Sequence, residues 1–246
     1  MKLRFTLTAA TILFAAASFL TSCKSYNVAA RYNSKYINNN NGKLSAQVSE
    51  TYELGYTMLA LTDLAQNDTA IVNHDTPYYQ DLMAWFGKYK NLKGVKQLNA
   101  DLTRNPKLIK SYLDGLYAFQ LNNGRFGLKS SYRIDLNKVD FKRYGILLEK
   151  FYKESNFQEF YAQHSGLYAQ MELKATNDYT FDEAQKTLNA TVKGYHIILS
   201  PLTKGYAGTM EIKSRSYSEY IVFPRAVNTN MSTAAKYAVN VNKSAE

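Results

Sequence analysis

Three histidines are the side chains best suited to bind a metal or act as a general base, and they lie far apart in the sequence. A catalytic zinc site uses three protein ligands and leaves one position open for water. The spacing of these histidines does not bring them together, so we assign no metal site and no cofactor. We expect His74 to be a polar loop residue, His164 a partly buried helix residue bonded to a neighbour, and His196 a strand residue on a polar face.

Other catalytic patterns are weak or absent. Glu50 and Glu53 are three residues apart and would share one face of a helix, where they could act as a carboxylate pair. A solvated helix face explains them more simply. The chain has no Gly-x-Ser-x-Gly nucleophile elbow, no Gly-x-Gly-x-x-Gly loop and no Walker loop. We therefore assign no catalytic residue.

The only cysteine, Cys23, ends a pattern typical of bacterial lipoproteins. Lys2 and Arg4 are followed by an uncharged apolar run and then by Leu-Thr-Ser-Cys at residues 20–23. This pattern predicts a signal peptide over 1–22 and acylation of Cys23, which would anchor the protein to a membrane. The alternative is an ordinary secretory signal followed by an incidental cysteine. Either signal disfavours nucleic acid as a partner.

The stretch after Cys23 is basic and rich in asparagine. The chain has a net charge of +10, and removal of Lys2 and Arg4 with the signal would lower it to +8. We expect residues 23–43 to form a flexible tether, because the stretch offers little apolar surface to bury. Its charge would favour anionic lipid or polymer near the membrane, although a solvated spacer with incidental charge is the favoured explanation.

The remaining chain is expected to fold as one α+β domain over residues 44–224, with a polar tail over 225–246 that could be a truncated continuation. Apolar residues at helical spacing are followed by β-branched and aromatic runs, which predicts a mainly helical layer and a small C-terminal sheet. The expected helices are 45–65, 76–86, 105–122, 140–153, 156–171 and 180–191, and the expected strands are 195–199, 209–214 and 220–223, with a further strand within 125–136.

The chain contains 21 tyrosines, most of them at positions expected to fill the core. Tyrosine also lines grooves for sugars and peptides, because it joins a stiff apolar ring to one polar atom. The candidate binding surface for a cell-wall glycan or an envelope protein is the tyrosine-rich region around the predicted strands. It comprises Tyr206, Tyr217 and Tyr220, flanked by Lys204, Lys213 and Arg215.

Asp68-Thr69-Ala70 is similar to the Asp-Ser/Thr-apolar acceptor for protein O-glycosylation in Bacteroidetes. Thr69 is therefore the candidate modification site, in a polar loop between two predicted helices. An ordinary turn is the alternative explanation for this short pattern.

Several segments resemble an uncharacterised Bacteroidetes lipoprotein family with the plan of a zincin-like metallopeptidase. They are Glu-Thr-Tyr-Glu-Leu at 50–54, Tyr-Tyr-Gln-Asp at 78–81, residues 155–164 and Tyr-His-Ile-Ile-Leu at 195–199, and the similarity covers about residues 45–223. In that family a helix with His-Glu-x-x-His follows, whose histidines would bind zinc. This chain lacks the motif. The resemblance therefore implies a non-catalytic relative, or the front part of an active peptidase; a glycan- or protein-binding module is the unrelated alternative.

The residues just after Cys23 also indicate where the protein is located. Surface-exposed lipoproteins of Bacteroidetes carry acidic residues just behind the acylated cysteine, and residues 24–27 contain none. We therefore expect an envelope lipoprotein at the outer membrane, with its domain facing the periplasm.

Overall fold

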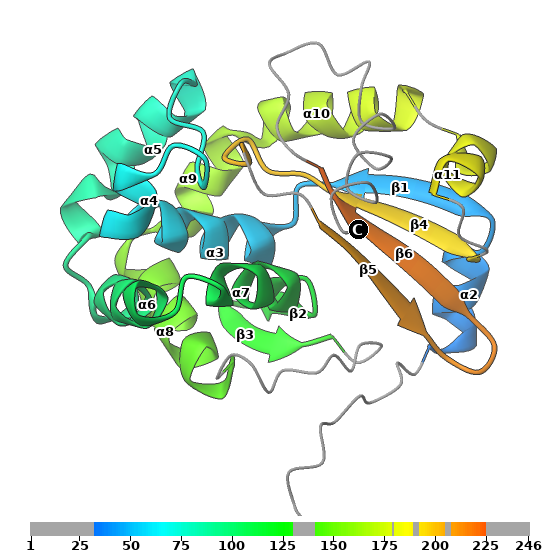
Figure 1. The fold of residues 1–246 in the computed structure, drawn as a ribbon, viewed down its shortest axis with the longest axis horizontal. Coiled ribbons are helices and arrows are strands. Elements are labelled where there is room, and N and C mark those ends of the chain that lie inside the picture. The colour runs from blue at the N-terminus through cyan, green and yellow to red at the C-terminus, as the bar shows by residue number, and fades with distance from the viewer. Residues whose placement is uncertain (1–31, 130–140, 179, 189–191, 205–207, 225–246) are drawn as a thin grey trace, which may run out of the picture.

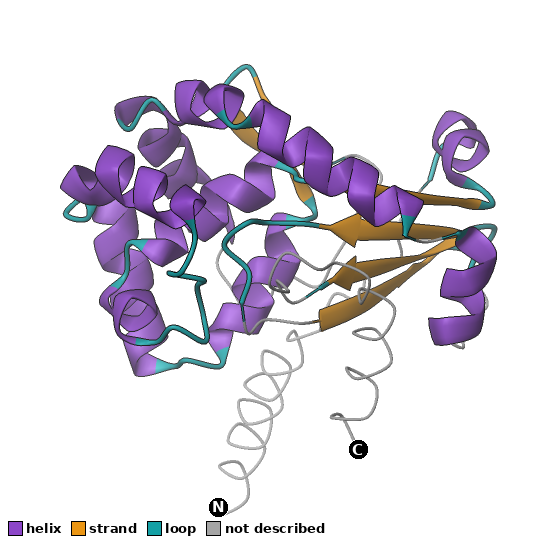
Figure 2. Ribbon diagram, turned by 90° about the horizontal axis from the view of Figure 1, so that it is seen from above, coloured by secondary structure: helices purple, strands orange, loops and turns teal. Residues whose placement is uncertain are grey.

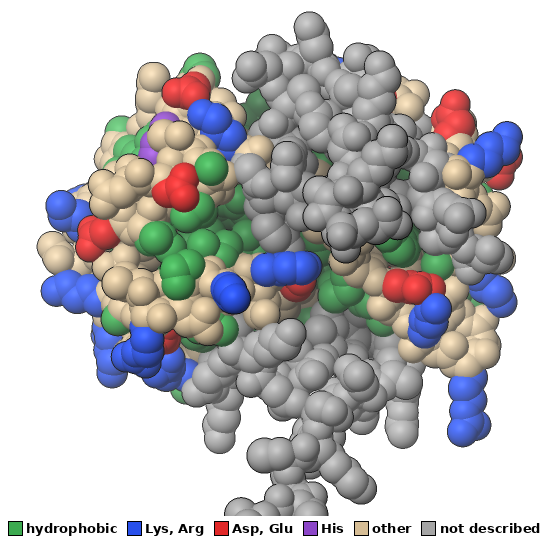
Figure 3. Space-filling model, viewed as in Figure 1, with side chains coloured by type: hydrophobic (Ala, Val, Ile, Leu, Met, Phe, Trp, Pro, Cys, Tyr) green, Lys and Arg blue, Asp and Glu red, His purple; other side chains and the backbone are tan. Residues whose placement is uncertain are grey.

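The computed structural model describes residues 32–129, 141–178, 180–188, 192–204 and 208–224. A helical lobe lies beside a four-stranded sheet, and helices also cover the sheet (Figure 1), so the fold is α+β as predicted. On the face seen in Figure 3, acidic and basic side chains are interspersed over the helical lobe. In the described part of the chain, no helix combines the length and apolar character needed to cross a membrane.

The elements alternate along the chain. The helices are α2 (Ser34–Asn40), α3 (Glu50–Ala60), α4 (Asp63–Asn67), α5 (Pro77–Phe86), α6 (Lys93–Arg104), α7 (Leu108–Leu116), α8 (Phe141–Glu154), α9 (Phe157–Gln163), α10 (Ser165–Asn177) and α11 (Phe181–Leu188), with a 3-10 turn at Gly87–Tyr89. The strands are β1 (Lys43–Gln47), β2 (Phe119–Asn122), β3 (Arg125–Leu128), β4 (Gly194–Ile198), β5 (Gly208–Lys213) and β6 (Ser218–Phe223).

The larger sheet has the strand order β1-β4-β6-β5. β1, β4 and β6 are mutually parallel, and β5 pairs antiparallel with β6. Every residue of the central strand β4 is buried, because both faces of the sheet are covered. Helices α10 and α11 lie over one face (Figure 2), where α11 packs on Tyr195 and Val222. Helix α2 contacts the opposite, inner face.

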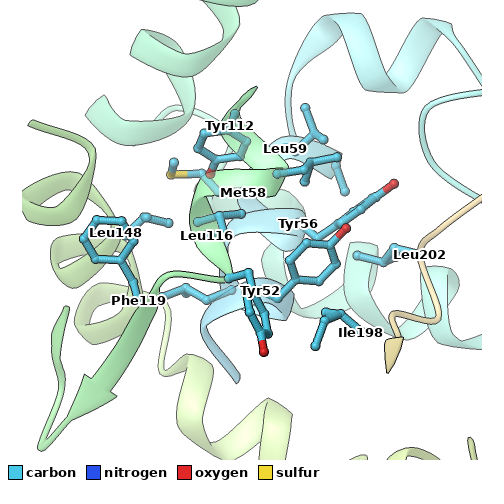
Figure 4. Packing of buried hydrophobic residues seen from close by; sticks show 14 of the residues in the cluster. Tyr52, Tyr56, Met58, Leu59, Tyr112, Leu116, Phe119, Leu148, Ile198 and Leu202 are labelled. Carbon is cyan, nitrogen blue, oxygen red and sulfur yellow. The ribbon is translucent and has the colours of Figure 1, made fainter. Parts of the chain in front are cut away.

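Helix α3 forms the centre of the helical lobe. All of its residues from Thr51 to Ala60 are buried, which is typical of a helix surrounded on every side. Tyr52 stacks on Phe223 at the end of β6, and Ile198 joins the same core (Figure 4), so the lobe and the inner face of the sheet share one apolar interior.

The start signals of two helices act as expected. The Thr76 hydroxyl accepts a hydrogen bond from the Tyr79 amide, and Pro77 occupies the first turn of α5. Thr180 and Glu183 form a reciprocal capping box at α11. Each pair satisfies backbone N–H groups that have no partner within the helix, so these boundaries depend on local sequence alone.

The turn at Asn123-Gly124 corrects one prediction. Both residues have positive φ angles, 50° and 73°, and connect β2 to β3 instead of ending a helix. Asn-Gly favours this geometry because a two-residue hairpin turn needs positive φ at both positions. Helix α7 ends earlier, at Leu116. Part of the strand expected within 125–136 is confirmed as β3, and residues 130–136 lie outside the described residues.

The N-terminal boundary of the domain also differs from the prediction. Helix α2 and strand β1 lie within the stretch expected to be a flexible tether, and β1 replaces the start of the helix expected from residue 45. Leu44 packs against the apolar cluster beneath α11. The Tyr36 side chain contacts a residue 183 positions away. Local composition gave no sign of this long-range contact, so the ordered domain begins before residue 44.

The structure differs from the prediction in one divided helix and one helix that was not predicted. The helix predicted for 156–171 is two helices, α9 and α10, which meet at His164. Helix α6 was not predicted, although Val95, Leu98 and Leu102 bury one of its faces at helical spacing.

Candidate functional site

Four polar side chains meet on the inner face of the sheet, and we call them the sheet cluster: Tyr36, Ser45, His196 and Glu219. Ser45 and His196 are direct partners in the parallel register of β1 and β4. Glu219 pairs with Gly194, two residues before His196. Because alternate residues of a strand share a face, His196 and the side chain of Glu219 project to the same side.

The sheet cluster is one chain of hydrogen bonds. Ser45 Oγ lies 2.7 Å from His196 Nδ1, and His196 Nε2 lies 3.1 Å from Glu219 Oε2. The Tyr36 hydroxyl donates to the same Glu219 oxygen at 2.7 Å. Burial increases along the chain, from half-buried Ser45 through His196, which is 6% exposed, to Glu219, which is 0% exposed.

The donors and acceptors fix the histidine tautomer when Glu219 is a carboxylate. Glu219 Oε2 then accepts from both Tyr36 and His196, so the histidine proton lies on Nε2. Nδ1 is left to accept from the Ser45 hydroxyl. This serine–histidine–carboxylate order is that of a nucleophile, its base and an orienting acid, with the two ring nitrogens exchanged relative to the common arrangement.

A lysine and three further tyrosines surround the sheet cluster. The Lys129 ammonium lies 4.2 Å from the centre of the Tyr117 ring. Burial lowers the pKa of Lys129 to about 8, while the Glu219 charge acts in the opposite direction. Burial also raises the pKa of Tyr217, whose ring packs edge-on against Tyr32 at 4.9 Å. These neighbours exclude water from the carboxylate side of the cluster.

A second polar group, which we call the Glu53 cluster, lies where β1 and β4 end: Glu53, Thr57, Tyr78, Tyr168 and Ser200. The Tyr78 hydroxyl donates to Glu53 Oε1 at 2.7 Å and lies 2.7 Å from the Tyr168 hydroxyl. Ser200 comes two residues after the end of β4, and Glu53 and Thr57 are one helical turn apart on α3. These segments meet because α3 follows β1 directly and packs against the inner face of the sheet.

Glu53 is fully buried, which raises its pKa to about 7. The Tyr78 and Ser200 hydroxyls lower the pKa but do not offset burial. Glu53 Oε2 and Thr57 Oγ1 have no partner with hydrogen-bond geometry among the described residues. The Glu53 carboxyl group is therefore mainly protonated below about pH 7.

An apolar pocket of about 330 Å³ lies between the β2–β3 hairpin and α8. Phe126, Leu128 and Ile146 contribute to its wall, and Glu149 is also at its lining. The Glu149 carboxylate accepts a hydrogen bond from the Phe126 amide at 2.8 Å, so it helps to hold the hairpin on α8.

The structure separates the three histidines. His164 bonds to the Phe160 carbonyl at 2.9 Å and to Asp81 at 3.4 Å, which confirms a partly buried residue bonded to neighbours. His74 lies in a loop, where its ring bonds to the Ala65 carbonyl. His196 is a strand residue as predicted, and it has polar neighbours, but the face of the sheet that it occupies is buried. Among the described residues, no group of three or more His, Cys, Asp and Glu could hold a metal ion.

The solvated helix face predicted for Glu50 and Glu53 is also wrong. Glu50 is half-buried, with the Tyr152 hydroxyl 3.4 Å away, and Glu53 is inaccessible. Spacing along α3 did not reveal this, because α9 and α10 and the loop after β4 cover the helix only after folding.

Tyr217 and Tyr220 do not form the predicted aromatic surface. Tyr217 is 2% exposed and points into the inner side of the sheet, whereas half-buried Tyr220 faces the other side, near Tyr195. Lys213 pairs with Glu211 at 2.9 Å, and Arg215 is exposed in the β5–β6 turn. Lys204 binds Asp75 at 2.7 Å, and Tyr206 lies outside the described residues.

Of the two candidate modification sites, Thr69 and Cys23, the structure describes only Thr69. Thr69 is exposed in the turn between α4 and α5, where the Ala70 amide donates to the Asp68 side chain at 2.9 Å. Cys23 and the predicted signal lie outside the described residues. The tail predicted over 225–246 does so too.

Comparisons with models of protein families, with curated proteins and with solved structures found no match. Ser45 and Glu219 were not predicted as site residues, although strand alternation places Glu219 on the same face as Tyr217, Ile221 and Phe223. The missing information was the parallel register that joins β1, β4 and β6.

Proposed function

We propose that this protein is a lipid-anchored lipoprotein of the bacterial cell envelope, with its α+β domain held close to the outer membrane on the periplasmic side. The observation that carries the proposal is the position of Cys23. It is the only cysteine of the chain, it completes a lipoprotein signal, and it lies nine residues before the first described residue, Tyr32.

The length of chain between Cys23 and the domain sets the distance from the membrane. Nine residues can span at most about 30 Å, even when fully extended. The described structure begins with Tyr32, whose ring stacks on Tyr36 at 5.1 Å. An acyl anchor on Cys23 would therefore hold the domain within roughly one domain diameter of the bilayer.

We further propose that the domain acts by binding or as a scaffold, as a non-catalytic relative of the zincin-like lipoproteins that it resembles. Both ring nitrogens of His196 are engaged within the sheet cluster, and both ring nitrogens of His164 have partners in the helical lobe. These histidines therefore serve contacts within the fold.

Metabolic labelling with an alkyne-bearing fatty acid tests the anchor. The wild-type protein should incorporate the label and fractionate with membranes, whereas Cys23→Ser should lose both properties. Ser25→Ala, just behind the acylation site, is the matched control and should keep them. An unlabelled wild type, or a labelled Cys23→Ser variant, would refute the anchor.

The sheet cluster favours a second candidate function, acyl-ester hydrolysis at Ser45. As Ser45 Oγ attacks an ester carbonyl, its proton would pass to His196 Nδ1, and the imidazolium would return it to the departing alkoxide, leaving the acyl group on Ser45. Water would then attack the acyl-Ser45 ester, with His196 Nδ1 taking the water proton and returning it to Ser45 Oγ as the carboxylic acid leaves. A fluorophosphonate probe tests this chemistry. Labelling that is lost in Ser45→Ala but kept in Ser49→Ala would support it, and absence of labelling in the folded wild type would count against it.

A further inference from the structure

We propose that the end of the sheet where the parallel strands β1, β4 and β6 begin is a docking surface for anionic phospholipid headgroups. We call this surface the basic edge, and it comprises Lys35, Lys43, Lys193, Lys213 and Arg215. The inference rests on the proposed anchor for its location beside a membrane, but its charge and geometry come from the domain itself.

Strand register brings the basic edge together from distant parts of the chain. Lys43 is paired with Gly194, the residue after Lys193, and the Gly42 amide donates to the Lys193 carbonyl at 2.8 Å. On the other side, the Lys193 amide donates to the Ser218 carbonyl at 2.9 Å. Ser218 is in turn paired with Lys213. The three lysines therefore lie in a row, at the starts of β1 and β4 and at the end of β5 beside the start of β6.

The turn and helix at this end add two more cations. Arg215 is exposed in the turn that joins β5 to β6. Lys35 is exposed on α2, which leads directly into β1 and lies at the same end of the sheet (Figure 1). In Figure 3, which has the same view, lysine and arginine side chains project along the lower right margin of the molecule.

Few carboxylates oppose this charge. All five basic side chains belong to exposed residues, while Glu219 is buried beneath them. Glu211 is exposed and pairs with Lys213 at 2.9 Å. Helix α11, over the other face of the sheet, adds Asp182 and Glu183, together with Lys186. The end of the molecule remains net positive when these groups are included.

The first described residue, Tyr32, lies near the same edge. The Tyr32 ring lies 4.9 Å from the ring of Tyr217, which follows Arg215 in the β5–β6 turn. Lys24 and Arg31 of the tether itself add positive charge. A chain anchored at Cys23 would therefore present the basic edge, and not the helical lobe, to the lipid surface.

Electrostatic attraction at an anionic bilayer increases with each lysine or arginine near the surface and falls within a Debye length. Loss of three such charges should weaken membrane partitioning roughly 100-fold at low salt. The same loss on the far side of the molecule should have little effect, because those charges would lie beyond that length.

Vesicle flotation of the mature chain, from residue 23 onwards with Cys23→Ser, measures docking without any acyl chain. Vesicles of phosphatidylcholine with phosphatidylglycerol are compared with vesicles of phosphatidylcholine alone. The test variant is K35Q/K43Q/R215Q, and the matched control is K90Q/K93Q/K96Q, which removes three exposed lysines around α6 at the opposite end of the molecule. Circular dichroism and melting temperature verify that each variant is folded.

The expected result is salt-sensitive binding to the anionic vesicles only, lost in the test variant and kept in the control. Equal binding to neutral vesicles, equal loss in both variants, or retention on purified cell-wall sacculi in place of vesicles would overturn the proposal. This outcome is separate from the fatty-acid labelling result, since the vesicle assay contains no acyl anchor and the labelling assay does not depend on the basic edge.

Discussion

Tyr78 Oη donates a 2.7 Å hydrogen bond to Glu53 Oε1, and both side chains are buried between α3, α5 and α10. A carboxyl group in such a place is costly as an anion, since water cannot solvate it. Glu53 nevertheless lies on α3, in which every residue from Thr51 to Ala60 is buried.

Glu53 should make the protein less stable as pH rises. Its folded pKa of about 7 lies above the ordinary value of 4.5, so the folded state holds the proton more tightly. Stability from this group is fully present below pH 4.5 and is lost as pH rises to about 7, by roughly 3 kcal/mol. Urea unfolding at pH 5 and pH 8 measures the loss.

Glu53→Gln should remove most of this pH dependence, because glutamine keeps the shape but does not ionise. Glu154→Gln, at an exposed position at the end of α8, is the matched control and should preserve it. A wild-type protein equally stable at both pH values would show that Glu53 is solvated and not buried.

Tyr36→Phe should loosen α2 from the sheet. The substitution removes the hydroxyl that donates to Glu219 Oε2 and leaves a buried carboxylate with fewer donors. The expected loss is about 1–3 kcal/mol in the free energy of unfolding. Amide hydrogen exchange should rise first in residues 34–47. Tyr89→Phe, in the helical lobe, should change neither quantity, and equal effects of the two variants would contradict the role of Tyr36.

Gly55→Ala and Gly166→Ala should have opposite signs although both lie in helices. A methyl group at Gly55 would overlap the buried side chain of Leu116, and at Gly166 it would meet open space. We expect Gly55→Ala to destabilise the protein by about 1–3 kcal/mol and Gly166→Ala to stabilise it by up to about 1 kcal/mol. Thermal unfolding of both variants compares them, and a neutral Gly55→Ala would mean that α3 and α7 can separate without cost.

Thr69 should carry a glycan in the native envelope. Its side chain is exposed in a turn fixed by the Asp68–Ala70 hydrogen bond, so an enzyme can reach it without unfolding the domain. The intact mass of the native protein should exceed that of the lipidated polypeptide, and Thr69→Val should remove the excess. Thr176→Val is the control, on the exposed face of α10. A wild-type mass equal to polypeptide plus lipid would end this prediction.

Local signals in the sequence were sufficient for many of the elements. The Thr76-Pro77 start of α5, the capping box at Thr180 and the apolar spacing of α8 each act within a few residues, and the structure confirms all three. The β-rich runs after Gly194 predicted β4, β5 and β6 for the same reason, since alternation and β-branched residues act along a single strand. From them the α+β class followed.

The same local rules failed where a contact joins distant segments. Residues 34–43 have the composition of a spacer, and a helix was predicted from residue 45. They form α2 and β1 instead, because β1 pairs with β4 about 150 residues later and Tyr36 reaches Glu219. Asn123-Gly124 is a strong turn signal in either context, and only the pairing of β2 with β3 made it a hairpin.

By itself, the sequence determined the lipoprotein pattern at Cys23, the helix caps and the class of the fold, because each depends on neighbouring residues or on a simple periodicity. The tertiary structure alone decided which polar groups meet. Ser45, His196 and Glu219 come together through parallel register, and Glu53 becomes buried when the helices close around α3. Parallel strands need long connections between them, so their partners cannot be read from adjacent residues.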